Sequence, residues 1–112
     1  MEESILKTIK KLLGIAVEYE YFDADLIVHI NSIIMTLSQL GLESAKKFEI
    51  TGKTETWGDL LQNDTCLNSV KTYLYLKVKL LFDPPSTSSV LESYKQTIQE
   101  LEWRINVQIE SP

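Results

Sequence analysis

The chain has one cysteine, one histidine and three prolines among its 112 residues. A single cysteine, Cys66, excludes a disulfide framework within the chain, and we interpret it as a small buried thiol of a protein that folds in a reducing cytosol. Nucleophilic triads and most zinc sites need a histidine with partners at defined spacings. His29 has only Asp25 one turn away, so we interpret it as a boundary residue and expect no metal ion and no cofactor.

Long hydrophobic runs are also missing. Charges interrupt every apolar stretch, so none approaches the roughly 18 to 20 apolar residues that a membrane span needs. Residues 1–14 are basic but contain neither a continuous apolar core nor a small-residue cleavage site, and we predict no signal peptide. The sequence therefore predicts a soluble protein that is not inserted in a membrane.

Basic residues are outnumbered by acidic ones. Eleven Lys and Arg against sixteen Asp and Glu give a net charge of -5, which disfavours tight binding to nucleic acid phosphates. An acidic surface would still let DNA slide past without sticking, because like charges repel. Tight nucleic acid binding is therefore not expected, although passage of DNA remains compatible with the composition.

Patterns that resemble catalytic or nucleotide-binding motifs are incomplete. Residues 52–54 resemble the end of a phosphate-binding loop, but the glycine required five positions before Gly52 is Lys47. Two carboxylate pairs have a spacing of two, which sends their side chains to different faces of a helix; they are Asp23 with Asp25 and Glu100 with Glu102. An enzyme would need a pocket with coupled titrating groups. We predict that the chain has no catalytic residue and is not an enzyme.

Apolar periodicity predicts two helices in the first third of the chain. Ser4 caps the first and Gly14 ends it, with a stripe at Ile5, Ile9, Leu12 and Leu13. Asp23 can cap the second and Gly41 ends it, with a stripe at Leu26, Ile30, Ile33, Ile34, Leu37 and Leu40.

Two longer helices are predicted in the second half. The third carries a wide apolar arc, which predicts a central position; it consists of one stripe at Leu67, Val70, Leu74, Val78 and Leu81 and a second at Tyr73, Leu76 and Leu80. The prolines of segment 83–86 then break the chain. The fourth helix should begin near Ser88 or Ser89 and run to about Ile109, with Leu91, Tyr94, Ile98, Leu101 and Ile105 at near-heptad spacing.

The connection over residues 42–65 has no helical period. Its part 48–51 alternates apolar and polar residues, so a short strand or a hairpin turning at Gly52 is one option. Thr56 and Asp59 form a capping box that opens a short helix through Leu61. The predicted fold is all-α, a single domain of residues 1–112 built as a small bundle of four main helices with this long loop between the second and the third.

Apolar residues continue past the point where the last helix has an obvious partner within the chain. We therefore predict an exposed docking tail over residues 103–112. Tryptophan is enriched at the energetic centres of protein interfaces. Trp57 and Trp103 lie in the two segments for which the predicted bundle offers the fewest packing partners. The candidate partner-binding residues are Trp103, Arg104, Ile105, Val107, Ile109, Phe48, Ile50 and Trp57.

The run of residues 70–85, followed by 100–107, resembles the head-to-tail connector proteins of long-tailed bacteriophages, also called adaptor or head completion proteins. Residues 57–61 and the early pair of short helices fit the same family, whereas residues 41–55 carry no match. The resemblance implies a structural virion protein that performs no chemistry. It is made in the host cytoplasm and then sits at the interface between head and tail.

The family further implies a set of partners. Copies of the subunit, usually twelve, would form a ring beneath the portal protein, extend the channel through which DNA passes and present a platform for the stopper and the tail. The segment 103–112 would reach toward the portal, and the excursion 42–65 would contact neighbours or the next ring. The alternative from another class is a cytosolic helical regulator, such as an antirepressor or antitoxin, that binds one protein partner and forms no ring.

Overall fold

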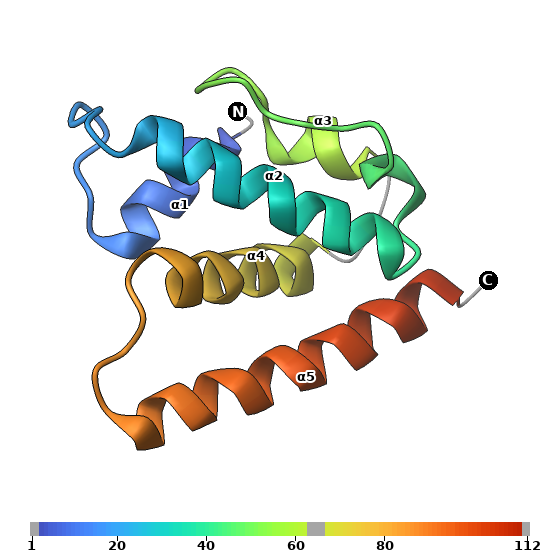
Figure 1. Ribbon diagram of the computed structural model, residues 1–112. Coiled ribbons are helices and arrows are strands. Elements are labelled where there is room, and N and C mark those ends of the chain that lie inside the picture. Colours follow the sequence, from blue (N-terminus) through green and yellow to red (C-terminus); the bar gives the residue numbers. More distant parts are fainter. Residues whose placement is uncertain (1–2, 63–66, 111–112) are drawn as a thin grey trace.

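The structure is a computed structural model that describes residues 3–62 and 67–110. Its helices, labelled in Figure 1, follow in the order α1 (Ile5–Leu13), α2 (Asp23–Gln39), the 3-10 turn η1 (Glu43–Ala45), α3 (Trp57–Leu61), α4 (Leu67–Phe82) and α5 (Ser88–Glu110). The described residues form no strand beyond one isolated bridge between Ser4 and Thr56. The prediction of an all-α fold with four main helices and one short one is confirmed.

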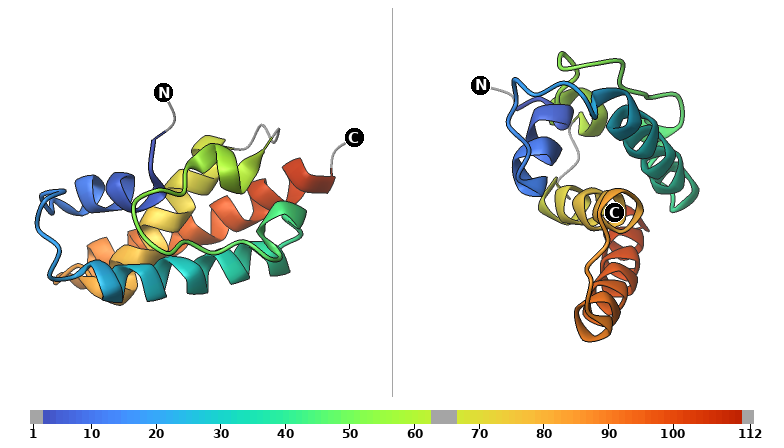
Figure 2. Two further views of the ribbon diagram at one scale, coloured as in Figure 1. Left: turned by 90° about the horizontal axis from the view of Figure 1, so that it is seen from above. Right: turned by 60° about the vertical axis from the view of Figure 1, so that its left-hand side comes forward.

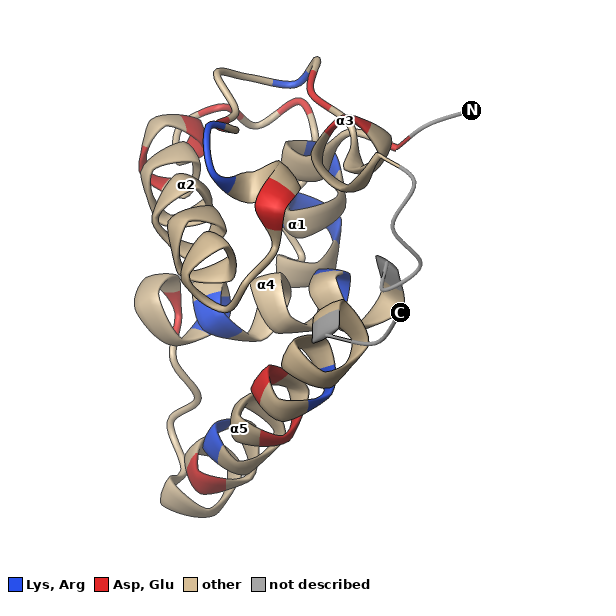
Figure 3. Ribbon diagram, turned by 90° about the vertical axis from the view of Figure 1, so that its right-hand side faces the viewer, with Lys and Arg blue, Asp and Glu red and all other residues tan. Residues whose placement is uncertain are grey.

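Helix α4 is the centre of the bundle, as its wide apolar arc predicts. It packs against α1, α2 and α5, while α5 lies along the side of α4 that faces away from α1 and α2 (Figures 1 and 2). The beginning of α5 projects away from the body of the molecule (Figure 3). No helix in the described ranges is long and apolar enough to cross a membrane.

The ends of α1 form as the sequence predicts. The Ser4 hydroxyl accepts a hydrogen bond of 3.2 Å from the Lys7 amide, and Gly14 ends the helix at φ = 81°, a left-handed conformation that glycine adopts without strain. Ile5 and Ile9 are fully buried. The prediction that Leu12 belongs to the buried stripe is wrong, since its side chain is 48% exposed. Leu12 lies in the last turn of α1 and lines a groove between α1 and α4.

The start of α2 differs from the prediction. Asp23 is the first helical residue, and the capping position is held by Phe22, which makes no side-chain cap bond. The Asp23 carboxylate instead pairs with the fully buried Lys10 at 2.7 Å. The Lys10 ammonium also donates to the carbonyls of Val17 and Tyr19 at 2.9 and 2.7 Å, so one buried cation fixes the whole connection from α1 to α2.

The predicted apolar stripe of α2 is buried from Leu26 to Leu37, whereas Leu40 is half-buried and caps the end of the helix. The helix ends before Gly41, whose φ is 114°. The prediction of a short strand or hairpin over residues 48–51 is wrong, since this segment is a loop without regular secondary structure. The side-chain amide of Asn31 supplies the bonds that a second strand would make: it accepts from the Ile50 amide at 2.7 Å and donates to the Ile50 carbonyl at 3.0 Å. One side chain therefore satisfies this stretch of backbone.

The remaining elements follow the sequence closely. The capping box of α3 forms with both of its hydrogen bonds, between Thr56 and Asp59. The predicted apolar arc of α4 is buried along most of the helix, at Val70, Tyr73, Leu74, Leu76 and Val78. Leu80 is half-buried, and Leu81 is 54% exposed because the chain turns away from the bundle after Phe82. The side chain of Leu67 and all of Cys66, including its predicted burial, lie outside the described residues.

Candidate protein-binding surfaces

The predicted docking tail separates into two faces of α5. Ile105 is fully buried, and Ile109 is half-buried with its methyl carbons 3.4 to 4.0 Å from where a Cβ of Gly41 would lie. The expectation that these two isoleucines lack a partner within the chain is therefore wrong. Trp103 is 67% exposed and Val107 is 40% exposed. The spacing of four residues places Trp103 and Val107 on one side of α5, opposite its buried side. We call this exposed side the outer face of α5.

Two polar contacts fix the orientation of this outer face. The Tyr73 hydroxyl donates to the Glu102 carboxylate at 2.9 Å, and the Asn106 side chain donates to the Leu40 carbonyl at 2.9 Å. Burial, and then the bond to Glu102, raise the pKa of the Tyr73 hydroxyl well above its usual range. These bonds tie α5 to α4 and to the end of α2, so that Trp103 is held outward by a rigid helix.

Arg104 lies on the exposed side of α5 beside Trp103. Its guanidinium pairs with Glu100 one turn earlier, and both side chains are more than half exposed. Such exposed pairs at a spacing of four add only about 0.3 to 0.5 kcal/mol to a helix. The arginine is therefore available to exchange this partner for an acidic group of another protein.

The candidates from the connection between α2 and α3 are mostly internal. Ile50 is 2% and Trp57 is 3% exposed, and the Trp57 indole N–H donates to the Thr8 hydroxyl at 3.0 Å. Both residues pack the connection onto the bundle. Phe48 is half-buried and lines a hollow of about 530 Å³ on the outer side of α2, together with Val28 and Met35. Phe48 is thus the residue of this group that reaches the surface.

Charge is segregated among the helices. α1 and α4 each carry three lysines and no acidic residue, whereas α2 carries two aspartates and no Lys or Arg (Figure 3). Within the described residues, neither Lys7 nor Lys11 on the exposed side of α1 has an ion-pair partner. This basic side of α1 was not among the residues predicted to bind a partner. Its signal in the sequence is the pair of lysines at a spacing of four.

The resemblance of residues 52–54 to a phosphate-binding loop does not extend to the structure. The amides of Thr51 and Gly52 donate to the Glu55 carboxylate at 3.0 and 3.3 Å, so these donors already hold an anion of the chain itself. Lys53 pairs with Glu20 at 2.7 Å. In the described part of the chain, no group of three or more His, Cys, Asp or Glu side chains could hold a metal ion, and His29 is half-buried on α2.

Comparison with known proteins gives one result. The family model described as "Phage connector protein" matches residues 5–112. No curated protein and no solved structure matches the chain. The matched region begins with the first residue of α1 and includes all five helices, so it covers the complete bundle. The chain belongs to the phage connector protein family.

Proposed function

We propose that the chain is a head-to-tail connector subunit that forms a ring under the portal, extends the DNA channel and links the capsid to the stopper or tail. The observation that carries the proposal is the match to the connector family over residues 5–112. Phage connectors are structural proteins, so the family implies that the chain is not an enzyme. Its partners are accordingly other proteins of the phage head and tail.

The net charge of -5 supports a role in which DNA passes without being held. Each lysine that contacts a phosphate adds to salt-dependent affinity, and several must act together for tight binding. Here Lys71, Lys79 and Lys53 are engaged by carboxylates of the chain itself. A channel built from such subunits would offer DNA few cationic contacts, and no sequence-specific binding is expected.

The outer face of α5 is the surface we assign to portal binding. Trp103 supplies a large apolar side chain that is 67% exposed, with Val107 one turn later and Arg104 beside it. Exposed tryptophan and arginine are the side chains most often found at the energetic centres of interfaces. Ile105 and Ile109 would hold this face in position from within the bundle. Phe48, with the hollow beside α2, would contact a neighbour or the next ring.

The first experiment is electron microscopy of a lysate from the parent phage with an early stop codon in this gene. Connector function predicts heads filled or emptied of DNA but without tails, beside free and complete tails. Expression of the wild-type chain from a plasmid should restore whole virions. Normal virions in the absence of the protein would refute the connector function and favour a helical regulator that binds one protein partner.

A second experiment tests the portal-binding face. Deletion of residues 103–112 would remove Ile105 from the core, so point variants are the better choice. Trp103→Ala combined with Arg104→Ala should weaken binding to the purified portal by about 2 kcal/mol or more, roughly thirtyfold, with an unchanged circular dichroism spectrum. Val90→Ala, at a residue of α5 that is 42% exposed, is the matched control. Equal portal affinity of the double variant and the control would refute this assignment.

A further inference from the structure

We propose that the exposed side of α2 in one copy of the chain packs into the groove between α1 and α4 of the next copy. The α2 face comprises Asp25, Val28, Ser32 and Met35. The α1–α4 groove has a volume of about 420 Å³ and is lined by Glu3, Thr8, Lys11, Leu12, Asn68, Lys71, Thr72 and Tyr75. The inference rests on the proposed function, because it names the contact that joins copies into a ring.

The α2 face is more apolar than a helix side exposed to water normally is. Val28 is 66% exposed and Met35 is 63% exposed, and their spacing of seven places them on the same side of the helix two turns apart. Asp25 is the only charged residue among these four, and the charged side chains of Lys46, Lys47 and Glu49 lie at the margin of the face, around the hollow that Val28, Ser32 and Met35 line. Anchors at such spacings are typical of a helix that inserts into a groove of another protein.

The α1–α4 groove offers the complementary chemistry. Leu12, which is 48% exposed, and the half-buried Tyr75 give it an apolar lining. Lys11 lies on its rim without an ion-pair partner among the described residues, and Lys71 pairs with Glu3 at 3.2 Å. Val28 and Met35 would cover the apolar lining, while Asp25 would meet the ammonium of Lys11. An interface of this kind combines an apolar centre with a charged rim.

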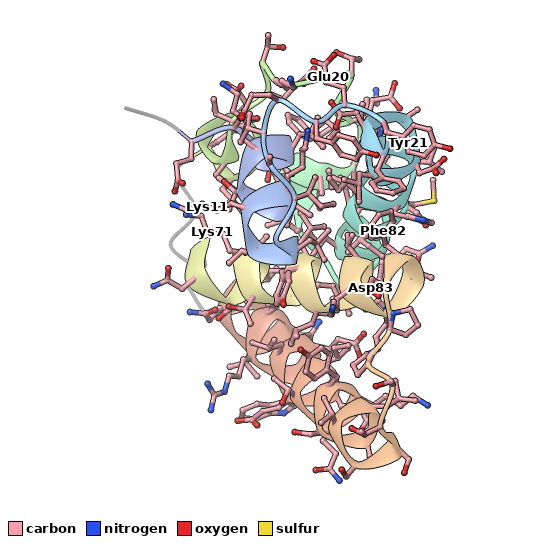
Figure 4. All side chains as sticks on the ribbon, turned by 90° about the vertical axis from the view of Figure 1, so that its left-hand side faces the viewer. Lys11, Glu20, Tyr21, Lys71, Phe82 and Asp83 are labelled. Atoms are coloured by element: carbon pink, nitrogen blue, oxygen red, sulfur yellow. The ribbon has the colours of Figure 1, made fainter. Side chains whose placement is uncertain are left out.

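The two surfaces lie on opposite sides of the molecule. In Figure 4, Lys11 and Lys71 lie at one edge, whereas α2 and Tyr21 lie at the other. A two-fold dimer would leave one of the two surfaces uncovered in each copy. A contact between different surfaces on opposite sides instead repeats from copy to copy, and it produces a closed ring when the rotation between neighbours closes.

The apolar part of the junction is tested with the double variant Val28→Glu and Met35→Glu. Both side chains are exposed in a single copy, so the variant should keep the circular dichroism spectrum and melting behaviour of the wild type. In the junction it would replace two apolar side chains that cover Leu12 and Tyr75 by carboxylates that must lose water there, which should abolish rings. Assembly is measured by native mass spectrometry and negative-stain electron microscopy, with the chain alone and with the portal. The control is Lys95→Glu, at an exposed lysine of α5.

The charged part of the junction is tested by reversal of the charge at position 11 or at position 25. Lys11→Glu and Asp25→Lys should each raise the concentration at which half of the chains are assembled on the order of tenfold, because each places like charges together. An equimolar mixture of these two single variants should assemble like the wild type. In alternating order, every junction of the mixture again joins one carboxylate and one ammonium.

The outcomes separate this junction from the function on which it rests. If both the wild type and the Val28→Glu, Met35→Glu variant form rings, the proposed junction is overturned and the connector function stays intact. Failure of the mixture to restore assembly would overturn the pairing of Asp25 with Lys11. If the wild-type chain forms no ring even when the portal is present, the ring itself is refuted, and the junction with it.

Discussion

Replacement of Lys10 by methionine should lower the free energy of unfolding by about 3 kcal/mol. The Lys10 side chain is fully buried, and its ammonium contacts three acceptors: the Asp23 carboxylate at 2.7 Å and the carbonyls of Val17 and Tyr19 at 2.9 and 2.7 Å. Methionine keeps the apolar stem but removes all three contacts. The loss belongs at the lower end of the range for broken buried ion pairs, because the Asp23 side chain is 17% exposed and keeps some contact with water, although its oxygen that faces Lys10 is buried.

The measurement is urea unfolding followed by circular dichroism, with Lys11→Met as the matched control. Lys11 is the next residue of α1 and is exposed, so its replacement should change stability by no more than about 0.5 kcal/mol. A loss of 3 kcal/mol should lower the melting temperature by roughly 10 to 20 °C in a domain of this size. The double variant Lys10→Met, Asp23→Asn should cost little more than Lys10→Met alone, since the carboxylate has already lost its partner.

Equal stability of the Lys10→Met and Lys11→Met variants would refute the reasoning. It would mean that the cost of burying the ammonium cancels the three contacts, so that the connection between α1 and α2 is held by packing alone. A double variant that loses much more stability than Lys10→Met would show that Asp23 has a second stabilising contact.

Three further predictions concern single side chains and are measured by the same unfolding experiment. Gly14→Ala should lower the free energy of unfolding by about 1 kcal/mol, because the φ of 81° strains any residue with a Cβ. No atom lies within 4 Å of the added carbon, so no clash adds to this strain. A loss of stability as large as that caused by truncation of a core residue would contradict this explanation. Ile105→Ala should cost about 3 kcal/mol, since Ile105 is fully buried, whereas Val90→Ala should cost well under 1 kcal/mol. Partial burial raises the pKa of Glu55, but bonds from Thr51 and the backbone outweigh it, so that the pKa lies below its usual value of 4.5. The stability that Glu55 adds is therefore present at neutral pH and decreases as the pH falls below about 4.5, so Glu55→Gln should destabilise the chain more at pH 7 than at pH 3.

The sequence predicted the candidate surfaces only in part. Trp103 was identified because it follows the last apolar residue with an obvious partner, and the structure places it on the exposed side of α5. Ile105 was assigned to the same surface, but it is buried, because α5 reaches beyond α4 to the end of α2. The length of the helix was read from the sequence. The angle at which it crosses α4, which decides which residues are covered, depends on packing across the whole bundle.

Local signals determined the helices of this protein and their ends. Capping by Ser4 and the pair Thr56 and Asp59, the positive φ of Gly14 and the apolar periodicity each act over a few residues, so the sequence alone suffices to read them. Contacts between distant residues were decided by the tertiary structure alone. In the sequence, Lys10 is one of three lysines of α1 and nothing distinguishes it from Lys7 and Lys11. The fold nevertheless buries its side chain against Asp23 and two backbone carbonyls. Burial of a charge depends on what surrounds it in three dimensions, and no spacing along the chain encodes that.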